Sequence, residues 1–352
     1  MACEIRDVLV IVSKLAVVAS ALVVLGAACS SGGQGPARAV TRPARVASPL
    51  INGRPRAAFV SVGASSEPWT LPTGVSRSVV LPDGNGFVVL GGLVIGDTST
   101  SRILQVDPVS GGSRIAGHLA LAVHDGAGAE IGNRFFVFGG GSTTSVALVQ
   151  AWKAGSAGEV ARLPEARSDL SAATLQGTTY IVGGFDGSAM TPTVLATTDG
   201  VALRPVANLA IPVRYAAVAA LGSTLWVMGG VTSTSEGGTT DTDAVQKVDL
   251  ISGRVTIAGR LLEPMGHATA LVLDGQIFVL GGRSGTVPSA AIFRLDTASG
   301  GLVPAGHLPE AVSDAGSVVV RGVGYLVGGE VASPADPLDM VVALRPSPQQ
   351  GS

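Results

Sequence analysis

The chain has 352 residues, of which 14% are charged and 49 are glycine, roughly double the average glycine usage of proteins. This composition excludes coiled coils, charged helical bundles and disordered acidic or basic chains. The formal net charge of -2, without any block of lysine or arginine, does not suit a nucleic-acid-binding protein, so no nucleic-acid partner is expected.

Residues 1–28 have the pattern of a secretory signal peptide. Arg6 and Lys14 precede an uncharged apolar run that ends in small residues directly before Cys29. The segment resembles the signal of bacterial lipoproteins, in which the cysteine is lipidated and becomes the mature N-terminus. The resemblance implies a lipid anchor on Cys29 at the outer, extracytoplasmic face of the cell membrane. Simple secretion and an uncleaved membrane anchor are the two alternatives.

Residues 29–56 are rich in Ser, Gly, Pro and Ala and have no periodic pattern, which predicts a flexible tether. Cys3 and Cys29 are the only cysteines, so the rest of the chain can contain neither a disulfide nor a cysteine-ligated metal. Residues 347–352 are expected to form a short tail.

A repeat governs the region between the tether and the tail. Gly-Gly pairs, each at the end of a β-type run, begin at positions 91, 139, 183, 229, 281 and 328. Each unit contains about four short β segments separated by glycine turns, the pattern of one propeller blade. The third segment of three units ends in an Asp-x-x-Ser-Gly turn, which begins at Asp107, Asp249 and Asp296. The sequence therefore predicts an all-β fold, a six-bladed β-propeller over residues 57–346.

The runs before the glycine pairs, such as IFVLGG at 277–282 and YLVGG at 325–329, carry an aromatic residue shortly before the pair. In this feature the sequence resembles the kelch-repeat family, and the resemblance implies kelch-like, four-stranded blades. The last unit stops before a fourth strand, while Ala57 to Leu71 supplies an unmatched one. We expect these segments to pair, because pairing closes the propeller and removes an open sheet edge.

Six polar positions repeat with the blades. The residues fourteen positions before the glycine pairs are Arg77, Asp125, Asp169, Tyr215, His267 and Asp314. The first strand of a blade faces the central channel, so these residues are expected to form a ring at its mouth. Arg167 and Arg214 flank this set in the sequence.

Two interpretations of the ring remain open. As a ligand site, Arg77, Arg167 and Arg214 would hold an anionic group or sugar hydroxyls, with His267 and the aspartates as polar or acid–base partners. As a structural feature, the ring would hold ordered water and satisfy strand ends at the mouth of a wet channel.

We expect a monomeric binding module whose partner is a protein or glycan of the cell envelope, without a cofactor or metal. The alternative is a carbohydrate-active enzyme of the sialate epimerase or mutarotase kind that uses the polar ring, and a third possibility is a purely structural envelope protein. The acidic loop at 231–243 matches no calcium-binding loop, so a solvated loop is expected there, although calcium binding stays open.

Overall fold

The computed structural model describes residues 61–331 and 335–347, and every regular element in these ranges is a β-strand. No helix able to cross a membrane occurs among these residues. The expected signal peptide, Cys29 and the tether lie outside the described residues, as does the expected tail apart from Ser347.

Six antiparallel, four-stranded sheets form six blades, which we number in chain order. Blade 1 contains β2 (Val79–Asp83), β3 (Gly86–Leu90), β6 (Arg102–Val106) and β7 (Ser113–His118). Blade 2 contains β8 (Ala127–Ile131), β9 (Arg134–Phe138), β10 (Leu148–Lys153) and β11 (Ser156–Arg162). Blade 3 contains β12 (Ser171–Leu175), β13 (Thr178–Val182), β14 (Thr193–Thr197) and β15 (Arg204–Asn208).

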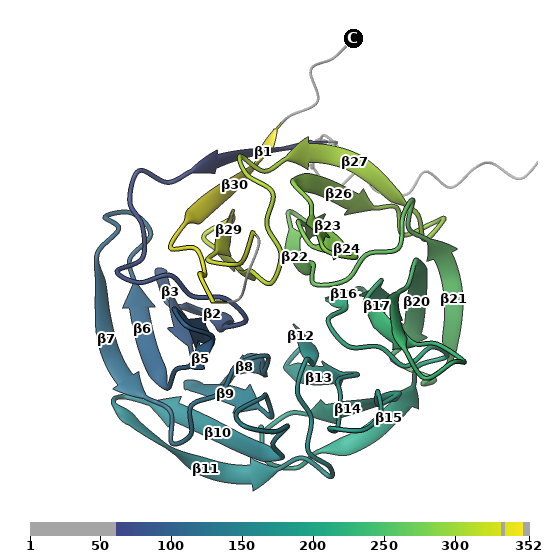
Figure 1. Cartoon of the computed structure of the whole chain (residues 1–352), viewed down its shortest axis with the longest axis horizontal. Helices are drawn as coiled ribbons and strands as arrows, with labels where there is room; N and C mark the ends of the chain where they lie inside the picture. Colours follow the sequence, from purple (N-terminus) through teal and green to yellow (C-terminus); the bar gives the residue numbers. More distant parts are fainter. Residues whose placement is uncertain (1–60, 332–334, 348–352) are drawn as a thin grey trace, which may run out of the picture. The chain divides into compact units, whose positions relative to one another are not determined.

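The remaining blades have the same order. Blade 4 contains β16 (Ala217–Leu221), β17 (Thr224–Met228), β20 (Ala244–Asp249) and β21 (Val255–Arg260). Blade 5 contains β22 (Thr269–Leu273), β23 (Gln276–Leu280), β26 (Ala291–Leu295) and β27 (Leu302–His307). Blade 6 contains β28 (Gly316–Val320), β29 (Val323–Val327), β30 (Val341–Ser347) and β1 (Ser61–Ser66). The blades surround a central axis with their first strands innermost, which confirms the predicted six-bladed β-propeller (Figure 1).

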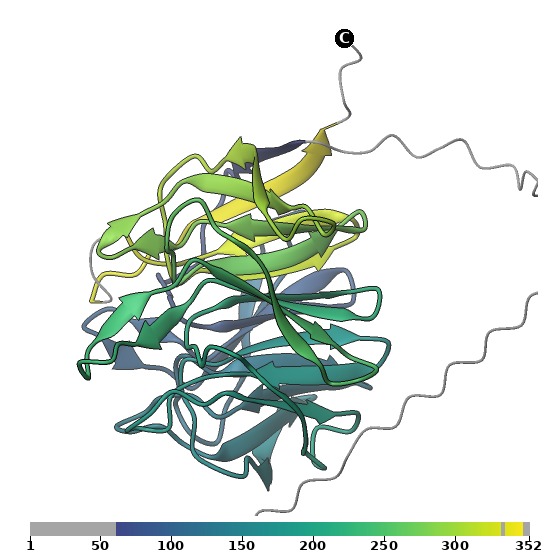
Figure 2. The same ribbon diagram turned by 90° about the vertical axis from the view of Figure 1, so that its right-hand side faces the viewer.

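The first described strand closes the propeller. β1 pairs with β30 in antiparallel register, with Ser61 opposite Ser347 and Ser66 opposite Val342. Figure 2 shows the purple β1 beside the yellow β30. The strand from the start of the described chain thus becomes the outer strand of the last blade, as expected from Ala57 to Leu71, and β30 is left without a free edge.

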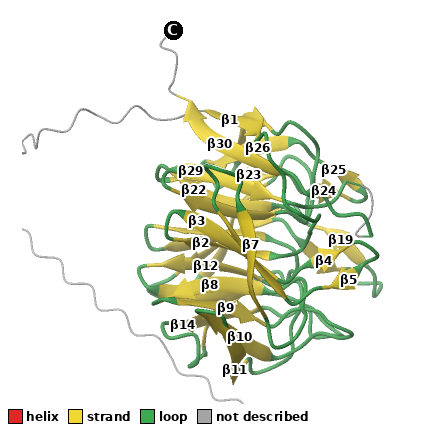
Figure 3. Cartoon of the chain, turned by 90° about the vertical axis from the view of Figure 1, so that its left-hand side faces the viewer, coloured by secondary structure: helices red, strands yellow, loops and turns green. Residues whose placement is uncertain are grey.

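The strands define two faces of the propeller. The ring face carries the connections between second and third strands and those from one blade to the next; the turn face carries the short turns at the other ends of the strands. Three small hairpins extend the ring-face connections: β4 (Leu93–Val94) with β5 (Thr98–Ser99), β18 (Val231–Ser233) with β19 (Thr239–Asp241), and β24 (Arg283–Ser284) with β25 (Val287–Pro288). Figure 3 shows β4, β5, β19, β24 and β25 together on this side.

The Gly-Gly pairs have a steric cause. The first glycine of every pair has a φ between 59° and 65°, and the second a φ between 88° and 109°. A Cβ atom on the first glycine would overlap a main-chain oxygen of the next blade, for example that of Val123 at Gly91. The same oxygen accepts a hydrogen bond from Gly92 N–H at 2.8 Å. Glycine therefore allows adjacent blades to join through their backbones.

The Asp-x-x-Ser-Gly turns form as the sequence predicts. Oδ1 of Asp107, Asp249 and Asp296 accepts the N–H group two residues later, at 2.9, 2.9 and 3.1 Å. These bonds close the turns between third and fourth strands. The hydrophobic core lies between blades: Val79 and Leu90 of blade 1, for example, pack with Val137 and Trp152 of blade 2.

Candidate functional site

Six polar residues, one from each blade, form a closed circle at the ring-face end of the central channel. They are Arg77, Asp125, Asp169, Tyr215, His267 and Asp314, which we call the polar ring. All six have left-handed backbones, with φ between 52° and 60°. Each N–H group donates to the carbonyl of the preceding ring residue at 2.8 to 3.0 Å, and Arg77 N–H donates to Asp314 to complete the circle. The ring therefore joins all six blades through its backbone.

A second set of residues lies beside the ring. The residue before each ring position forms a β-bridge with the residue after the Gly-Gly pair of its own blade. We call these pairs the outer tier: Ser76 with Leu93, His124 with Gly141, Ser168 with Phe185, Arg214 with Val231, Gly266 with Arg283, and Ser313 with Glu330. This arrangement adds Phe185, Arg283 and Glu330 to the candidate site. The sequence did not assign them to the site, although they share one slot of the repeat; Glu330, expected in a solvated acidic loop, is buried.

Arg77 joins groups from three other blades. Its Nε donates to Glu330 Oε1 at 2.8 Å, and its Nη1 donates to Asp125 Oδ2 and to the Tyr215 hydroxyl, both at 3.2 Å. The Tyr215 hydroxyl in turn donates to Asp125 Oδ2 at 3.3 Å. Because blades 1 and 4 lie opposite each other in a six-bladed disc, the Arg77–Tyr215 contact spans the axis and narrows this end of the channel.

The imidazole of His267 lies between the carboxylate of Asp314 and the guanidinium of Arg283. Its Nδ1 lies 2.7 Å from Asp314 Oδ1, and its Nε2 lies 2.9 Å from Arg283 Nη2. A guanidinium can only donate, so Nε2 must accept and Nδ1 must carry the proton that is donated to Asp314. The hydrogen bonds therefore fix the neutral imidazole in one tautomer.

Planar side chains stack in a column across blades 3, 4 and 5. The Arg214 Cζ atom lies 5.1 Å from the centroid of the Phe185 ring and 5.3 Å from that of Tyr215. The Tyr215 ring stacks on His267 with a centroid distance of 3.9 Å. Arg214 also donates to Asp169 Oδ2 at 3.0 Å and keeps 25% of its side chain exposed. We call this stack the aromatic–arginine column; its outer members, Arg214 and Phe185, remain partly exposed.

Burial and neighbouring charges shift the pKa values of the site. Burial raises the pKa of the Asp125 carboxyl despite its contact with Arg77, and Asp169 and Asp314 add to the effect. Burial also raises the pKa of the Tyr215 hydroxyl. For Asp314, burial is outweighed by the hydrogen bond from His267, by the charge of Arg77 and by the hydrogen bond from Ser313, so its pKa is lowered.

Two further groups follow the same physics. Burial opposes the charge of Arg77, but Asp125 and Glu330 outweigh it and raise the pKa of the guanidinium. Burial, followed by the charge of Arg77, lowers the pKa of His124. Near neutral pH Arg77 is therefore charged, and Tyr215 and His124 are neutral. Every side chain of the polar ring is also hydrogen-bonded to another residue of the site or its neighbours.

Arg167 lies apart from the polar ring. Its guanidinium donates to the carbonyls of Gly183 at 3.3 Å and Thr193 at 2.9 Å, and to Glu165 Oε1 at 2.7 Å. The side chain is only 1% exposed and does not line the channel. Arg167 thus holds the connections of blade 3, whereas the other seven candidates lie in the ring or beside it.

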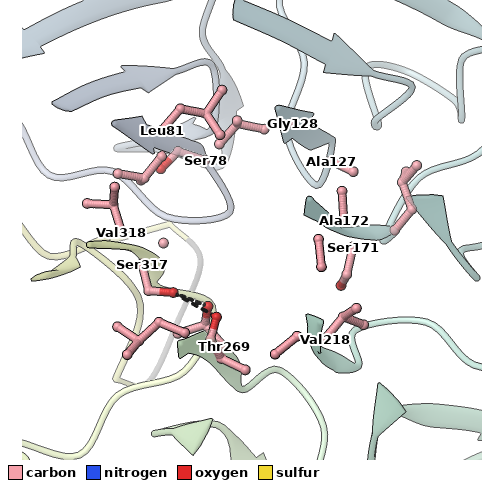
Figure 4. A pocket seen from close by; sticks show the side chains of 18 of the residues that line it. Ser78, Leu81, Ala127, Gly128, Ser171, Ala172, Val218, Thr269, Ser317 and Val318 are labelled. Atoms are coloured by element: carbon pink, nitrogen blue, oxygen red, sulfur yellow. Dashed lines mark hydrogen bonds between the residues drawn. The ribbon is translucent and has the colours of Figure 1, made fainter. Parts of the chain in front are cut away.

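The channel has a volume of about 540 Å³. The first strands of all six blades line it, from the polar ring almost to the turn face, whereas Phe185, Arg283 and Glu330 of the outer tier do not. The wall is rich in small side chains, such as Ala127, Ala172 and Ser171 (Figure 4).

Backbone groups add polar atoms to the channel wall beside these small side chains. Each first strand is the terminal strand of its sheet, so one of its backbone edges faces the channel. Hydroxyl groups satisfy part of this edge: Ser171 Oγ donates to the Ala216 carbonyl at 2.8 Å, and Ser317 Oγ donates to the Ala270 carbonyl at 3.4 Å. The remaining main-chain groups need water or a ligand as partners, which is consistent with the structural interpretation of the ring.

Within residues 61–331 and 335–347, no group of three or more His, Cys, Asp or Glu side chains is arranged to hold a metal ion. Two acidic residues of the loop 231–243 have different surroundings. Glu236 is exposed, whereas Asp241 Oδ2 accepts a hydrogen bond from Gly285 N–H at 2.6 Å.

Comparison with known proteins supports the fold and leaves the family open. No protein-family model matches the chain, and no curated protein matches its sequence. Solved structures do match, among them one described as the structure of YjhT, with a TM-score of 0.62 and 14% sequence identity. The match covers 78% of this chain and 95% of that chain. At this identity the likeness shows the propeller fold alone.

Proposed function

We propose that this chain is an exported binding module, held at the outer face of the cell membrane by a lipid on Cys29, with a protein or glycan of the cell envelope as its partner. The lipoprotein-like signal of residues 1–28 and the kelch-like repeats support this proposal. The partner binds the ring face, where the connections between strands differ from blade to blade while the strands beneath them repeat.

The observation that carries the proposal is the contrast between the polar ring and the aromatic–arginine column. The ring is internally paired and joins the blades, so it provides a rigid base. Arg214 and Phe185 lie beside it on the ring face and are only partly buried. A preorganised surface of this kind binds with little loss of conformational freedom, because the scaffold is already ordered.

The entry point of the chain agrees with this arrangement. Ser61, the first residue of β1, is paired with Ser347 at the turn-face end of blade 6. The chain ahead of β1 therefore joins the propeller at the turn face, opposite the face that we propose for the partner.

The enzymatic alternative is not better supported than binding. A sialate epimerase or mutarotase would need an acid or base free to move protons at the ring, but His267 is held in one tautomer between Asp314 and Arg283. The arginines also do not converge on the channel, because Arg167 and Arg214 do not line it.

The binding role is tested with the mature chain carrying Cys29→Ser, used as bait against envelope extracts and on a glycan array. Phe185→Ala and Arg214→Lys each remove one planar group from the aromatic–arginine column. Arg214→Lys keeps the positive charge beside Asp169. We expect each to weaken binding by about tenfold or more, as for a central contact residue. Arg254→Lys on the turn face is the matched control, and binding that survives both ring-face changes would overturn the proposed site.

The anchor is tested separately. Cys29→Ser should release the full-length chain from the membrane fraction of cells that export it. Retention of the variant in that fraction would point to an uncleaved membrane anchor and contradict lipidation.

A further inference from the structure

A cavity lies between blade 1 and the connection from β1 to β2, apart from the central channel. It has a volume of about 250 Å³ and shares no lining residue with the channel. Its aliphatic lining differs in exposure: Val75 and Val89 are buried, Leu104 is half-buried, and Ile115 is 55% exposed. The cavity therefore has an apolar wall that solvent can reach.

One arginine lies at this apolar wall. Arg102 and Leu104 are alternate residues of β6, so their side chains face the same side of the sheet. Arg102 Nη1 donates to Thr73 Oγ1, which also belongs to the lining, at 3.3 Å. Among the described residues the guanidinium has no carboxylate partner. The cavity thus combines aliphatic side chains with an unpaired positive charge.

In blades 2 and 4 a glutamine stands at the position of Leu104. Leu104, Gln150 and Gln246 each pair with the residue two positions before the Gly-Gly pair of their blade. Gln150 accepts a hydrogen bond from Leu121 N–H at 2.8 Å and donates to the Leu121 carbonyl at 3.1 Å. Gln246 makes the same two bonds with Ile211, at 3.0 and 2.8 Å. Both glutamines are 0% exposed, so they hold the incoming connection against the blade.

Leucine cannot make these bonds in blade 1. Thr73 is the equivalent of Leu121 and Ile211, because each lies four positions before the polar-ring residue. The N–H and carbonyl of Thr73 have no hydrogen-bond partner in the part of the chain that the structure describes. A main-chain donor and acceptor are therefore free in the lining of the cavity.

In blade 3 an ion pair lies at the equivalent place. Arg167 and Glu165 stand where blade 1 has Val75 and Thr73, two and four positions before the polar-ring residue. Arg167 Nη2 donates to Glu165 Oε1 at 2.7 Å, and its Nη1 donates to the carbonyls of Gly183 and of the first residue of β14. The fold thus accommodates a guanidinium and a carboxylate here, whereas blade 1 supplies only the guanidinium, from β6.

We propose that the cavity of blade 1 binds a small organic monocarboxylate. The carboxylate pairs with Arg102 and takes the part of Glu165 in blade 3, and the N–H of Thr73 is available as a second donor. The apolar body of the ligand covers Val89 and Leu104. The cavity is smaller than the roughly 300 to 1,000 Å³ typical for drug-sized ligands, so this body is short. Bound ligand joins the connection to blade 1, as the glutamines do in blades 2 and 4, and so stabilises the propeller.

The test compares hexanoate with hexanamide, which has nearly the same size and no charge. Binding to the mature Cys29→Ser chain is measured by ligand-observed NMR, and Tm is measured with and without each compound. We expect hexanoate to bind about tenfold more tightly than hexanamide, because a charge-assisted hydrogen bond is stronger than a neutral one. Hexanoate should also raise Tm.

Variants locate the site. Arg102→Gln should weaken hexanoate binding about tenfold and leave hexanamide binding unchanged, whereas Arg102→Lys should keep a preference for the acid. Arg254→Gln removes an exposed arginine of the turn face and is the matched control. Leu104→Gln introduces the glutamine of blades 2 and 4, so it should weaken the binding of both compounds about tenfold without lowering Tm.

Several results would overturn the proposal. Absence of hexanoate binding to the parent, or equal affinity for the acid and the amide, would show that Arg102 does not attract a carboxylate. An Arg102→Gln variant that binds hexanoate as tightly as Arg254→Gln does would assign the binding to another part of the propeller. Undiminished binding of both compounds to folded Leu104→Gln would show that they do not occupy the cavity.

Discussion

Replacing the first glycine of a Gly-Gly pair should destabilise the propeller far more than replacing a glycine of similar conformation in a turn. Gly91 has a φ of 64° and Gly84, in the same blade, has a φ of 60°. A Cβ atom on Gly84 would meet nothing within 4 Å, whereas one on Gly91 would lie 2.5 Å from the Val123 oxygen of the connection to blade 2. Comparing Gly91→Ala with Gly84→Ala thus separates steric overlap from backbone strain.

The expected magnitudes follow from these contacts. A left-handed alanine costs about 1 to 2 kcal/mol, which both variants share. In Gly91→Ala, Val123 must also move away, and the 2.8 Å hydrogen bond from Gly92 N–H to its carbonyl is lost or lengthened. Leaving a buried backbone group unpaired costs about 1 to 3 kcal/mol more. We therefore expect a total of about 2 to 5 kcal/mol for Gly91→Ala and about 1 to 2 kcal/mol for Gly84→Ala.

Urea unfolding of the mature Cys29→Ser chain, followed by tryptophan fluorescence, measures both variants against the parent. Thermal unfolding provides a second measure, because each kcal/mol lowers Tm by roughly 2 °C or more in a large domain. Equal free energies of unfolding for Gly91→Ala and Gly84→Ala would refute the steric explanation and leave only the conformational preference of glycine.

Three further predictions test closure, ion pairing and titration. Deleting Ser61–Ser66 should lower Tm far more than deleting residues 30–56, because only the first exposes the edge of β30; equal Tm values would contradict the closure. Glu330→Gln should destabilise the chain by about 1.5 to 3 kcal/mol in urea unfolding because the buried Arg77 guanidinium loses the nearest of its three carboxylates, whereas Glu159→Gln in an exposed pair should change stability by less than about 1 kcal/mol. The folded-state pKa of Asp125 is raised, so the parent should lose stability as pH rises from about 4 towards that pKa, and Asp125→Asn should not. If the stability difference between Asp125→Asn and the parent is the same at pH 4 and pH 7, the assigned titration is wrong.

The sequence predicts the parts of this fold that have a local physical cause. The Gly-Gly pairs reveal the blade count because only glycine fits where Gly91 meets Val123, and the aspartate turns follow from a hydrogen bond within four residues. The closure by β1 follows from counting strands. The polar ring follows from counting along the repeat, because equivalent positions must converge in a closed disc.

The pairing of side chains could not be predicted in the same way. Glu330 lies 253 positions from Arg77 in the sequence and reaches it only because the propeller closes. Arg167 is two residues from Asp169, but its backbone direction places its guanidinium among the carbonyls of blade 3 instead of in the channel. These outcomes depend on the packing of blades and not on the local sequence.

The left-handed backbone of the polar ring indicates which of its side chains have a role beyond the ring itself. Aspartate tolerates this conformation, so Asp125, Asp169 and Asp314 suit the backbone circle without further explanation. Arg77 and Tyr215 adopt it at a cost of about 1 to 2 kcal/mol each, which glycine would avoid, and His267 at a smaller cost, because histidine occurs there more often.

What these three residues gain is contact between side chains of different blades. Arg77 donates to the Tyr215 hydroxyl, and the Tyr215 ring stacks on His267. Their identities are therefore explained by side-chain interactions and not by backbone preference. Tyr215→Asn separates the two causes, because asparagine relieves the backbone strain while it removes both contacts. We expect this variant to be less stable than the parent and to open the ring end of the channel; a gain in stability would show that backbone strain dominates at this position.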